Sequence, residues 1–555
     1  MTKEIFSKSE SFKEEYCSTI IRVGELKDIE NSDNLKQAII DGFSVVVNKN
    51  DVKEGDYMIY CKNETKLNSS FLSINNMYEI GERHLNSNAI EVEKLVSEGK
   101  QDEAKNMVGY FNKHGRVKMI RLRGCLSMGV LLTLDSLVNW KPELSGVNLS
   151  DYVTYDDNGN FIPFDFDTIC GDLFVKAYVP RTNPVRNGGG NGKNNRKYRQ
   201  FDRMIEGEWN FHYESQQLNS NMWKLKPDDN VVISNKLHGT SAVFGNVLVK
   251  KNTLLNRFRN IINSFRDKKI SRIEREIDKL NKKLKGVSEK ADNATISFEG
   301  VVDCVNMEIL MGVLNEDISK LEKKKSKIEN RKIKKFDTEY YDIYSSRTVI
   351  KNQYINKYVN SGFYSSDIWS EYHDLLKGKI PHNVTIYGEI VGYLTNSDRM
   401  IQKNYDYGCE PGTNKLMIYR VNKKMEDGTH REYEIDEVID FTNNLVAIFP
   451  NISDRIMPYP ILFHGKLSDL YPDIDPSNHW NENVLEALKN DKEHFGMELN
   501  EPMCRNSVPR EGICLRIDND PVKECFKLKT LYFLGKEAKE IDKGEVDIEM
   551  ADAYN

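Results

Sequence analysis

Short runs of β-branched and aromatic residues, separated by polar turns, recur through the first third of the chain. They read STIIRVGEL, AIIDGFSVVVNK, GDYMIYCK and KMIRLRGCLSMGVLLTL. Runs of this length and composition predict β-strands, and the last one predicts a single long strand. The stretch NAIEVEKLVSEGKQDEAKNMVGYFNKH predicts helix between them. We therefore expect residues 1–170 to form a β-rich domain with a helical stretch.

Many short strands of this kind suit a small barrel, and we predict an OB-like β-barrel that binds nucleic acid. The last long strand is basic, with Arg116, Lys118, Arg121 and Arg123. These side chains either contact a nucleic acid or are solvated charges at a sheet edge. The sequence leaves both interpretations open.

Residues 171–210 differ in composition from both flanks. RTNPVRNGGGNGKNNRKYRQ is basic and rich in Gly and Asn, which predicts a flexible linker. Its basic side chains either contact phosphates or belong to a tether with no such role: Arg186, Lys193, Arg196, Lys197 and Arg199.

Residues 211–555 combine strand and helix patterns and are interrupted by a charged segment at 253–335. Apolar residues recur in this segment at heptad spacing: Ile270, Ile273, Ile277, Leu280, Leu284 and Val287. A weaker stripe follows the break GVSEKADNATISFEGVVDC: Leu314, Ile318, Leu321 and Ile328. Two such helices predict an antiparallel hairpin inserted in the domain. It is either a packing arm or a contact for RNA, a partner or a second copy.

Composition narrows the class of protein. The 555 residues carry a net charge of −6, so any nucleic-acid surface must be local. Apolar runs such as GVLLTL and YGEIVGYL are too short to span a bilayer. The N-terminus lacks a signal-peptide core, so we expect a soluble intracellular, cytoplasmic protein without a membrane partner. The sequence leaves its origin, phage-encoded or bacterial, open. The nine cysteines are scattered without a C-x-x-C pair, which argues against a disulfide framework or a zinc site.

A lysine between two strand-forming runs is the strongest candidate for chemistry. Lys236 follows DDNVVISN, is followed by His238 and Gly239, and precedes AVFGNVLVK. The pattern K-x-x-G alone occurs often by chance. Its weight rises because further polar residues follow inside strand-like runs, in the order Ser345, Ser346, Arg347, Glu389, Tyr419, Glu511, Lys527 and Lys529.

Each of these residues taken singly has a structural interpretation. Glu389 and Glu511 can be half-exposed strand carboxylates, Tyr419 a core aromatic, and the lysines at 527 and 529 the wet face of a strand with period two. The set favours chemistry instead, because burying a charge in an apolar strand is costly without a partner. Lysines, an arginine and two carboxylates can partner one another around a nucleotide.

The ordered set resembles the covalent nucleotidyltransferase superfamily of ligases and capping enzymes. The matching strings are KLHG at 236–239, SSR at 345–347, YGE at 387–389, IY at 418–419, EGI at 511–513 and KLK at 527–529. DNA ligases and capping enzymes usually carry Asp where this chain has His238, whereas K-x-H-G-T is typical of RNA ligases of the phage and kinetoplastid-editing type. Three longer strings resemble the Deinococcus-type RNA ligases: IQKNYDYGCEPGTNKLMIYRVN, CRNSVPREGICLRID and EAKEIDKGEVDIEMADAY.

This resemblance implies an α+β protein with an OB-like β-barrel ahead of a nucleotidyltransferase (ATP-grasp-like ligase) domain at 211–555, built of antiparallel sheets and helices. It implies an ATP-dependent RNA ligase that seals 3′-hydroxyl and 5′-phosphate ends, at nicks in a duplex, through lysyl-AMP and 5′-adenylylated RNA. The implied cofactors are ATP and Mg²⁺, with Mn²⁺ as an alternative. The implied partners are RNA ends in a nicked RNA duplex or an RNA/DNA hybrid.

Residue roles follow from the same resemblance. Lys236 would attack the α-phosphorus of ATP, and a lysine amine, whose ordinary pKa is about 10.4, is nucleophilic only when neutral. Lys527, Lys529 and the metal would favour the neutral amine, and the two lysines would hold the α-phosphate. The other expected roles are metal binding by Glu511, ribose binding by Glu389, adenine stacking by Tyr419, phosphate or ribose contacts by Arg347 and Arg516, adenine-edge recognition by the backbone at Asn235, close backbone approach at Gly239, and the later steps for His238.

Two alternatives stay open. A DNA ligase or a capping-type nucleotidyltransferase would normally place its OB domain after the catalytic domain, whereas few residues follow Lys529. A non-catalytic RNA-binding protein with a degenerate transferase domain would lack a motif lysine or glutamate, and none is missing here.

Overall fold

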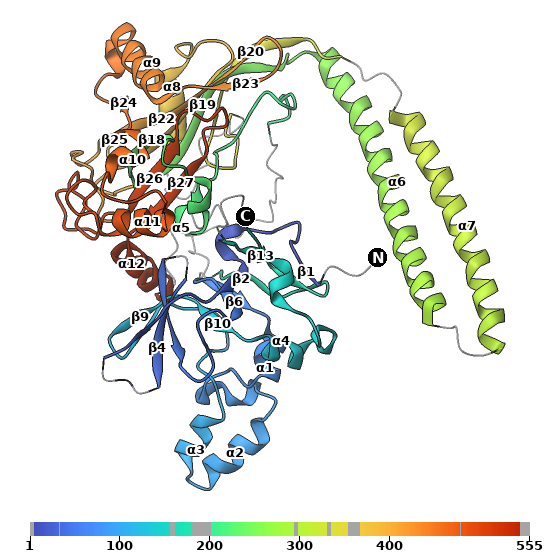
Figure 1. The fold of residues 1–555 in the computed structure, drawn as a ribbon. Coiled ribbons are helices and arrows are strands. Elements are labelled where there is room, and N and C mark those ends of the chain that lie inside the picture. The colour runs from blue at the N-terminus through green and yellow to red at the C-terminus, as the bar shows by residue number, and fades with distance from the viewer. Residues whose placement is uncertain are drawn as a thin grey trace, which may run out of the picture. The chain divides into compact units, whose positions relative to one another are not determined.

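A computed structural model describes residues 5–543 of the chain, apart from 31, 33, 41, 156–160, 180–200, 294–297, 330–334, 353–366 and 478. The chain divides into two compact units (Figure 1). The main unit comprises Met1–Tyr198, Phe211–Gly245 and Tyr344–Asn555, and the hairpin unit comprises Arg199–Asn210 and Asn246–Ile343. Residues 180–200 of the predicted linker at 171–210 lie outside the described residues, and with them Arg186, Lys193, Arg196, Lys197 and Arg199.

Small antiparallel sheets form the N-terminal domain of the main unit. One has the order β10-β6-β2-β13, with β2 (Ser18–Arg22), β6 (Tyr57–Cys61), β10 (Val130–Leu132) and β13 (Phe164–Phe166). A second has the order β3-β4-β5, with β3 (Leu26–Asp28), β4 (Leu35–Ile40) and β5 (Phe43–Asn48). A short three-stranded sheet has the order β1-β14-β15, with β1 (Phe6–Ser7), β14 (Thr168–Ile169) and β15 (Asp172–Leu173). Short pairs are β7 (Thr65–Leu67) with β16 (Val175–Ala177) and β11 (Thr154–Tyr155) with β12 (Phe161–Ile162). These are open sheets in the described part of the domain, rather than the closed barrel that we predicted.

The N-terminal domain contains the predicted helical stretch and further helices that the sequence did not predict. The predicted helical stretch forms α2 (Ala89–Ser97) and α3 (Gln101–Asn106). Helices α1 (Ser69–Ile74) and α4 (Leu134–Trp140) pack on the core, where Phe71 meets Trp140 and Phe174 edge-on. Strands β15 and β16 belong to this domain, so it continues to Ala177 rather than ending at residue 170.

The predicted long strand at the end of this domain is wrong. It breaks into β8 (Ile120–Leu122), β9 (Cys125–Ser127) and β10. Arg123 and Gly124 turn the chain with φ of 49° and 83°, and Gly129 turns it again with φ of 92°. Such left-handed conformations end a strand, because its regular φ is strongly negative.

Two larger sheets follow, and they carry the candidate site. The first has the order β17-β27-β26-β18-β25, with β17 (Gln216–Gln217), β18 (Asn230–Lys236), β25 (Ile461–Lys466), β26 (Gly512–Ile517) and β27 (Cys525–Lys529). The second has the order β20-β19-β21-β22-β23, with β24 beside β22; its strands are β19 (Thr240–Lys250), β20 (Thr338–Ser345), β21 (Val384–Gly392), β22 (Asn414–Lys424), β23 (His430–Glu432) and β24 (Ile456–Pro458).

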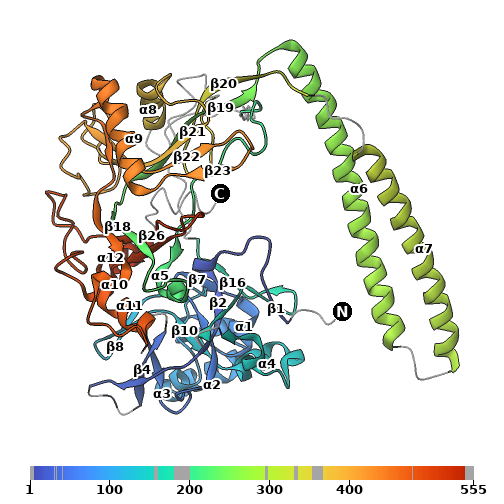
Figure 2. The ribbon, with the colours of Figure 1, turned by 45° about the horizontal axis from the view of Figure 1, so that its top comes forward.

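Helices cover one face of each sheet. Helices α8 (Ile368–Leu376) and α9 (Ile435–Ile448) pack on the second sheet (Figure 2), with Trp369, Tyr372 and Val438 in a shared core. Helices α5 (Leu218–Asn221), α10 (Leu467–Leu470) and α11 (Trp480–Asn490) pack on the first sheet around Phe526. The C-terminal helix α12 (Leu531–Asp542) follows β27 directly. This mixture of antiparallel sheets and covering helices confirms the predicted α+β class.

The hairpin unit contains two long helices that run side by side, α6 (Leu254–Asn293) and α7 (Phe298–Glu329) (Figures 1 and 2). They are antiparallel, because Lys325 of α7 pairs with Glu274 of α6 at 2.8 Å and the end of α7 lies at Arg266. Ile273 and Leu314 of the predicted apolar stripes are buried. The helices are longer than predicted, since most of the expected break is helical. Among the described residues, no helix is both long and apolar enough to cross a membrane.

Gly512 is required at the start of β26. Its φ is +147°, and a Cβ there would lie 2.0 Å from the Leu528 carbonyl oxygen of β27. We expect Gly512→Ala to lower the free energy of unfolding by about 1–3 kcal/mol, because both the conformation and the space exclude a side chain. Urea unfolding followed by circular dichroism measures this loss.

Gly535→Ala in α12 is the matched control. Its Cβ would meet only the Met119 methyl at 3.9 Å, an ordinary contact, and alanine favours a helix interior over glycine by up to about 1 kcal/mol. An unchanged unfolding curve for Gly512→Ala would contradict the steric argument.

Candidate active site

Lys236 is the last residue of β18, a central strand of the first sheet. Val231, Val232 and Ile233 favour the extended backbone and are buried. Lys236 pairs in register with Gly512 of β26. This pairing places the lysine beside Glu511, and its Nζ lies 2.6 Å from the Glu511 Oε1. Two residues 275 positions apart are therefore in contact because their strands are neighbours.

The Glu511 carboxylate is shared by three basic side chains. Besides Lys236, its oxygens lie 3.6 Å from the Lys529 Nζ and 3.7 Å from the His238 Nδ1. Its side chain is 1% exposed. A carboxylate this buried would be very unfavourable alone, and the ammonium groups compensate it. The sequence prediction that these charged residues partner one another is consistent with this geometry.

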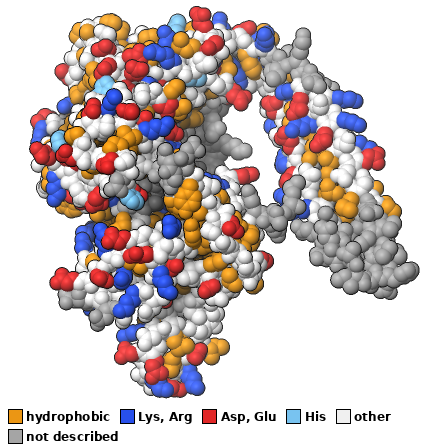
Figure 3. Space-filling view, viewed as in Figure 1, with side chains coloured by type: hydrophobic (Ala, Val, Ile, Leu, Met, Phe, Trp, Pro, Cys, Tyr) orange, Lys and Arg blue, Asp and Glu red, His pale blue; other side chains and the backbone are white. Residues whose placement is uncertain are grey.

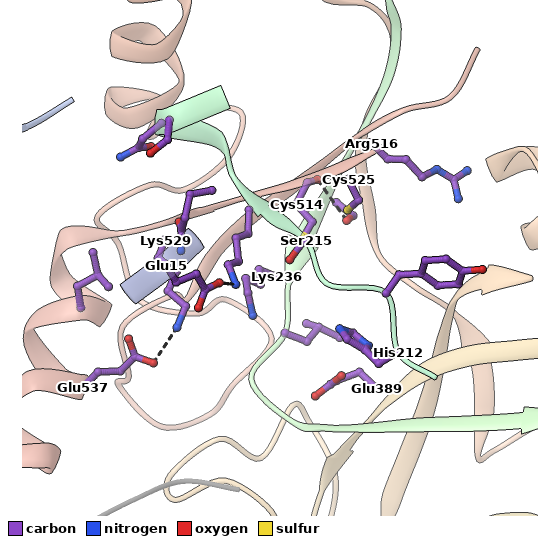
Figure 4. A pocket seen from close by; sticks show the side chains of 18 of the residues that line it. Glu15, His212, Ser215, Lys236, Glu389, Cys514, Arg516, Cys525, Lys529 and Glu537 are labelled. Carbon is purple, nitrogen blue, oxygen red and sulfur yellow. Dashed lines mark hydrogen bonds and ion pairs between the residues drawn. The ribbon is translucent and has the colours of Figure 1, made fainter. Parts of the chain in front are cut away.

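Lys527 and Lys529 lie on the same face of β27 and line the same cavity as Lys236. The residues between and before them, Leu528 and Phe526, are buried in the core on the other face. The Lys529 Nζ is 2.8 Å from the carboxylate of Glu537 in α12, which points toward it in Figure 4. Alternation along one strand thus places both ammonium groups in the cavity.

Lys527 has a partner from the N-terminal domain. A short 3₁₀ helix, Glu14–Tyr16, presents Glu15, whose carboxylate forms an ion pair with the Lys527 ammonium. The same turn is held by the neighbouring Glu14, which accepts hydrogen bonds from Asn221 at 2.6 Å and, through its carbonyl, from the Lys62 Nζ at 2.9 Å. Sequence reasoning missed Glu15, because its polar surroundings have no pattern that marks a site.

Glu389 and Tyr419 line the cavity from the second sheet, on β21 and β22. The Tyr419 hydroxyl is 3.0 Å from the His212 Nδ1, which is also 3.1 Å from the Ser241 Oγ. Burial raises the pKa of Tyr419, so the phenol stays neutral. Sequence reasoning also missed His212, because it lies in an irregular segment that contains no motif.

Arg347 and Arg516 reach the cavity already paired. The Arg347 Nε donates to the Glu214 carboxylate at 3.0 Å, and Arg516 donates to Asp518. Both line the cavity. A phosphate in the cavity would have to share each guanidinium with a carboxylate. We therefore expect the two arginines to contribute less to phosphate binding than the three lysines.

Asn235, His238 and Gly239 do not line the cavity. The Asn235 amide donates to both oxygens of Glu501 at 3.1 and 3.2 Å and accepts from the Arg510 Nε at 2.9 Å. This buried network ties the residue before the lysine to the residue before Glu511. Its side chain therefore has a positioning task, while the predicted adenine contact concerns only its backbone.

His238 and Gly239 pack against the structure around the site. The imidazole of His238 meets the rings of Tyr405 and Phe533 edge-on, at 4.9 and 5.1 Å between centroids. A Cβ at Gly239 would lie 2.5 Å from the Ile390 carbonyl oxygen. The glycine thus permits close approach to strand β21, a reason that differs from the predicted approach to a nucleotide.

The three lysines, the two arginines, Glu389 and Tyr419 line a cavity of about 290 Å³ (Figure 4). Its volume is at the lower end of the range of small-molecule sites. The walls come from both large sheets, from α12 and from the N-terminal domain, which contributes Tyr60 and Lys62 besides Glu15. Ammonium groups, carboxylates and a buried phenol converge there, a combination suited to a phosphorylated, aromatic ligand.

Comparison with known proteins identifies the N-terminal domain. Residues 17–134 match a protein-family model described as an OB-fold domain. This match confirms the predicted OB-like architecture, although the sheets are open. No curated protein sequence matches the chain.

Solved structures of an RNA ligase from Naegleria gruberi are similar to this chain. A mutant with ATP and Mn is 13% identical, with a TM-score of 0.44 over 94% of this chain and 98% of that chain. Another mutant, with AMP and Mn, gives 13% and 0.45 over the same shares. The enzyme with PPi gives 13% and 0.44, again over 94% and 98%. TM-scores this low do not establish a common fold.

The Glu511 carboxylate is the candidate metal ligand. No cluster of three His, Cys, Asp or Glu side chains suited to a metal occurs in the described part of the chain. A hard dication such as Mg²⁺ takes few protein carboxylates and completes its shell with phosphates and water. Glu511 fits that pattern, because it is a buried oxygen donor among the lysines that would contact the phosphates.

Two cysteines line the cavity beside Lys236, Cys514 on β26 and Cys525 on β27. A hydrogen bond from the Cys514 thiol lowers the pKa of Cys525 to about 7, and the positive charges of Arg420, Arg516 and Lys236 act in the same direction. The ordinary thiol pKa is about 8.5. Cys525 is therefore the more nucleophilic of the two thiols near neutral pH.

We expect alkylation of Cys525 by iodoacetamide to rise with pH through a midpoint below that of an ordinary thiol, because only the thiolate reacts. Mass spectrometry of the Cys525 peptide follows the rate. Cys504 in the same sample is the control, since burial raises its pKa to about 12 and it should react far more slowly. A Cys525 midpoint near 9 would contradict the assignment of the thiolate.

Proposed function

We propose that this protein is an ATP-dependent RNA ligase that joins a 3′-hydroxyl to a 5′-phosphate at nicks in a duplex. The observation that carries the proposal is the placement of Lys236 at a strand end in a cavity, with its Nζ 2.6 Å from the buried Glu511 and with Lys529 close behind. The motifs that resemble the covalent nucleotidyltransferases supply these residues. The strand register brings them together.

In the first step the neutral amine of Lys236 attacks the α-phosphorus of ATP. An N–P bond forms, the bond from the α-phosphorus to the bridging oxygen breaks, and pyrophosphate leaves. Lys527 and Lys529 are placed to hold the α-phosphate and to stabilise the charge that develops on it. A divalent cation at Glu511 would neutralise phosphate charge and draw that carboxylate away from the lysine.

The nucleoside would lie toward the second sheet. Tyr419 would stack on the adenine, since its ring is fixed by the hydrogen bond to His212 and by edge-on packing against Tyr459 at 5.6 Å. Glu389, 6% exposed in β21, would accept hydrogen bonds from the ribose hydroxyls. Both side chains come from strands, so their positions are set before the ligand binds.

The later steps transfer AMP to RNA and then seal the strand. The 5′-phosphate of the RNA attacks the lysyl-AMP phosphorus, so the N–P bond breaks and a 5′–5′ pyrophosphate forms. The 3′-hydroxyl then attacks, and AMP leaves. We assign His238 to these steps as a positioning residue, because it contacts the Glu511 carboxylate at 3.7 Å.

The OB-fold domain would hold the duplex on either side of the nick. Arg116 is not available for this role, because its guanidinium is buried between Glu64 at 2.7 Å and Asp542 at 2.6 Å. Arg121 and Arg123 of the β8–β9 hairpin are exposed and are the better candidates for phosphate contacts.

Incubation with α-labelled ATP and Mg²⁺ tests the nucleophile. The parent protein should retain label after denaturation, because the phosphoramidate is covalent, and Lys236→Ala should retain none. Lys251→Ala, an exposed lysine outside the cavity, is the matched control and should label fully. Labelling of Lys236→Ala at the parent level would overturn the proposed function. Nicked RNA, DNA and hybrid duplexes then distinguish an RNA ligase from a DNA ligase.

Glu15 should compete with the nucleotide for Lys527. Its carboxylate occupies the lysine that we assign to the α-phosphate, so Glu15→Gln should lower the KM for ATP in self-adenylylation several-fold. Glu10→Gln, an exposed residue of the same segment, is the control. A KM that rises in Glu15→Gln would show instead that the ion pair supports the nucleotide-binding geometry.

A further inference from the structure

The first four turns of α6 have the reverse of the usual amphipathic arrangement. Their polar face contacts the chain segments next to the two helices within the hairpin unit. The Asn256 amide donates to the Lys251 carbonyl at 3.0 Å and to the Asp337 carbonyl at 2.8 Å, and Asn256 is 3% exposed. Arg259 pairs with Asp337 at 3.2 Å, and Asn260 accepts a hydrogen bond from Lys250. Polar side chains thus anchor this part of the helix to the chain's own backbone.

The apolar face is exposed. Leu254 is 81% exposed, and Phe258 and Phe265 are 62% and 63% exposed. The full stripe follows the helical steps of one, three and four and is made of Leu254, Leu255, Phe258, Ile261, Ile262 and Phe265. A surface helix normally turns such a stripe to the core. An exposed apolar stripe of this size marks an interaction surface.

Helix α7 does not cover the stripe. Its last residue, Glu329, accepts a hydrogen bond from Arg266 at 2.9 Å, and Ile328 accepts another from the same guanidinium. The packed seam of the hairpin, with Ile273 and Leu314, lies beyond that point. The stripe therefore extends past the end of the partner helix.

Basic residues border the stripe on both sides. Residues 254–269 contain five arginines and lysines and one acid, Asp267. At 100° per residue, Arg257 and Lys268 lie along one border. Arg259 and Arg266 lie along the other, where they already pair with Asp337 and with the end of α7. Apolar and basic side chains are adjacent on the surface of the hairpin (Figure 3). The surface that covers this stripe should be apolar with negative charge at its edge.

Two kinds of partner fit less well. A second copy would bring like-charged borders together, which is unfavourable. A protein groove receives the apolar face of a helix between two walls, whereas one flank of this helix is occupied by Asp337 and by the end of α7. A flat anionic surface needs only one exposed face of a helix.

We propose that residues 254–269 bind the surface of an anionic lipid bilayer, with the stripe at the boundary between headgroups and acyl chains. Helices with Phe, Leu and Ile on one face and Lys or Arg at its border lie in this interface. The expectation of no membrane partner came from the lack of a spanning segment, and a helix that lies on a bilayer does not need one. The proposal is independent of the ligase assignment.

Co-sedimentation of the full-length chain with vesicles tests it. The protein should pellet with vesicles of equal parts phosphatidylglycerol and phosphatidylcholine, and much less with phosphatidylcholine alone. The variant Phe258→Ser/Phe265→Ser should stay in the supernatant. Arg257→Gln/Lys268→Gln should bind roughly fivefold more weakly per charge removed, because each cation contributes about 1 kcal/mol near an anionic surface.

The double variant Ile448→Ser/Val522→Ser is the matched control. These residues are 68% and 70% exposed outside α6 and should not affect pelleting. Absence of binding to the anionic vesicles, or equal binding by the Phe258→Ser/Phe265→Ser variant, would overturn the proposal. Self-association that this variant abolishes in sedimentation velocity would overturn it too, in favour of a second copy.

Discussion

The site depends on one buried carboxylate. Glu511 is almost fully removed from water and is tolerated because Lys236 and Lys529 approach it from two strands of one sheet. None of these charges would be stable in this position without the others. The register of β18, β26 and β27 therefore has an electrostatic reason as well as a packing reason. A ligand that carries negative phosphates and a divalent cation can replace this internal pairing with a similar one of its own.

The OB-fold domain takes part in that site. Glu15 forms an ion pair with Lys527, Lys62 lines the cavity, and Arg116 joins Glu64 to Asp542 in α12. The domain therefore supplies a carboxylate where a phosphate would bind. The buried Arg116 contact, by contrast, is structural.

In the hairpin unit, α6 and α7 pack together through apolar stripes, since Ile273 and Leu314 are buried. The start of α6 differs, because its polar side chains form hydrogen bonds with the backbone at Asp337 and its apolar side chains are exposed to solvent. Uncovered apolar area is a cost in water, so its presence at a fixed place on a long helix indicates a use.

Local pattern was enough to predict much of the fold. Strands β2, β5, β6, β18, β21 and β22, the helices α2 and α3, and the hairpin lie where β-branched runs or heptad spacing placed them. The lysines and glutamates of the motifs were also found in this way, because each is an unexpected charge inside an apolar strand. The long strand before β10 was predicted wrongly, since positive φ at Arg123 depends on the turn it closes.

The tertiary structure alone decided which side chains meet. Glu15 and His212 join the site from segments without any motif, because contacts between distant parts of a chain leave no local signal. Glu537 begins one of the strings that carry the resemblance, but no site role was predicted for it. Asn235, which precedes Lys236, was predicted to contact adenine through its backbone, but its side chain donates a hydrogen bond to Glu501. Periodicity likewise predicted that α6 has an apolar and a polar face, but it did not show which face packs against the rest of the hairpin unit. A sequence pattern records the repeat of an element, and only packing determines what lies against each side of it.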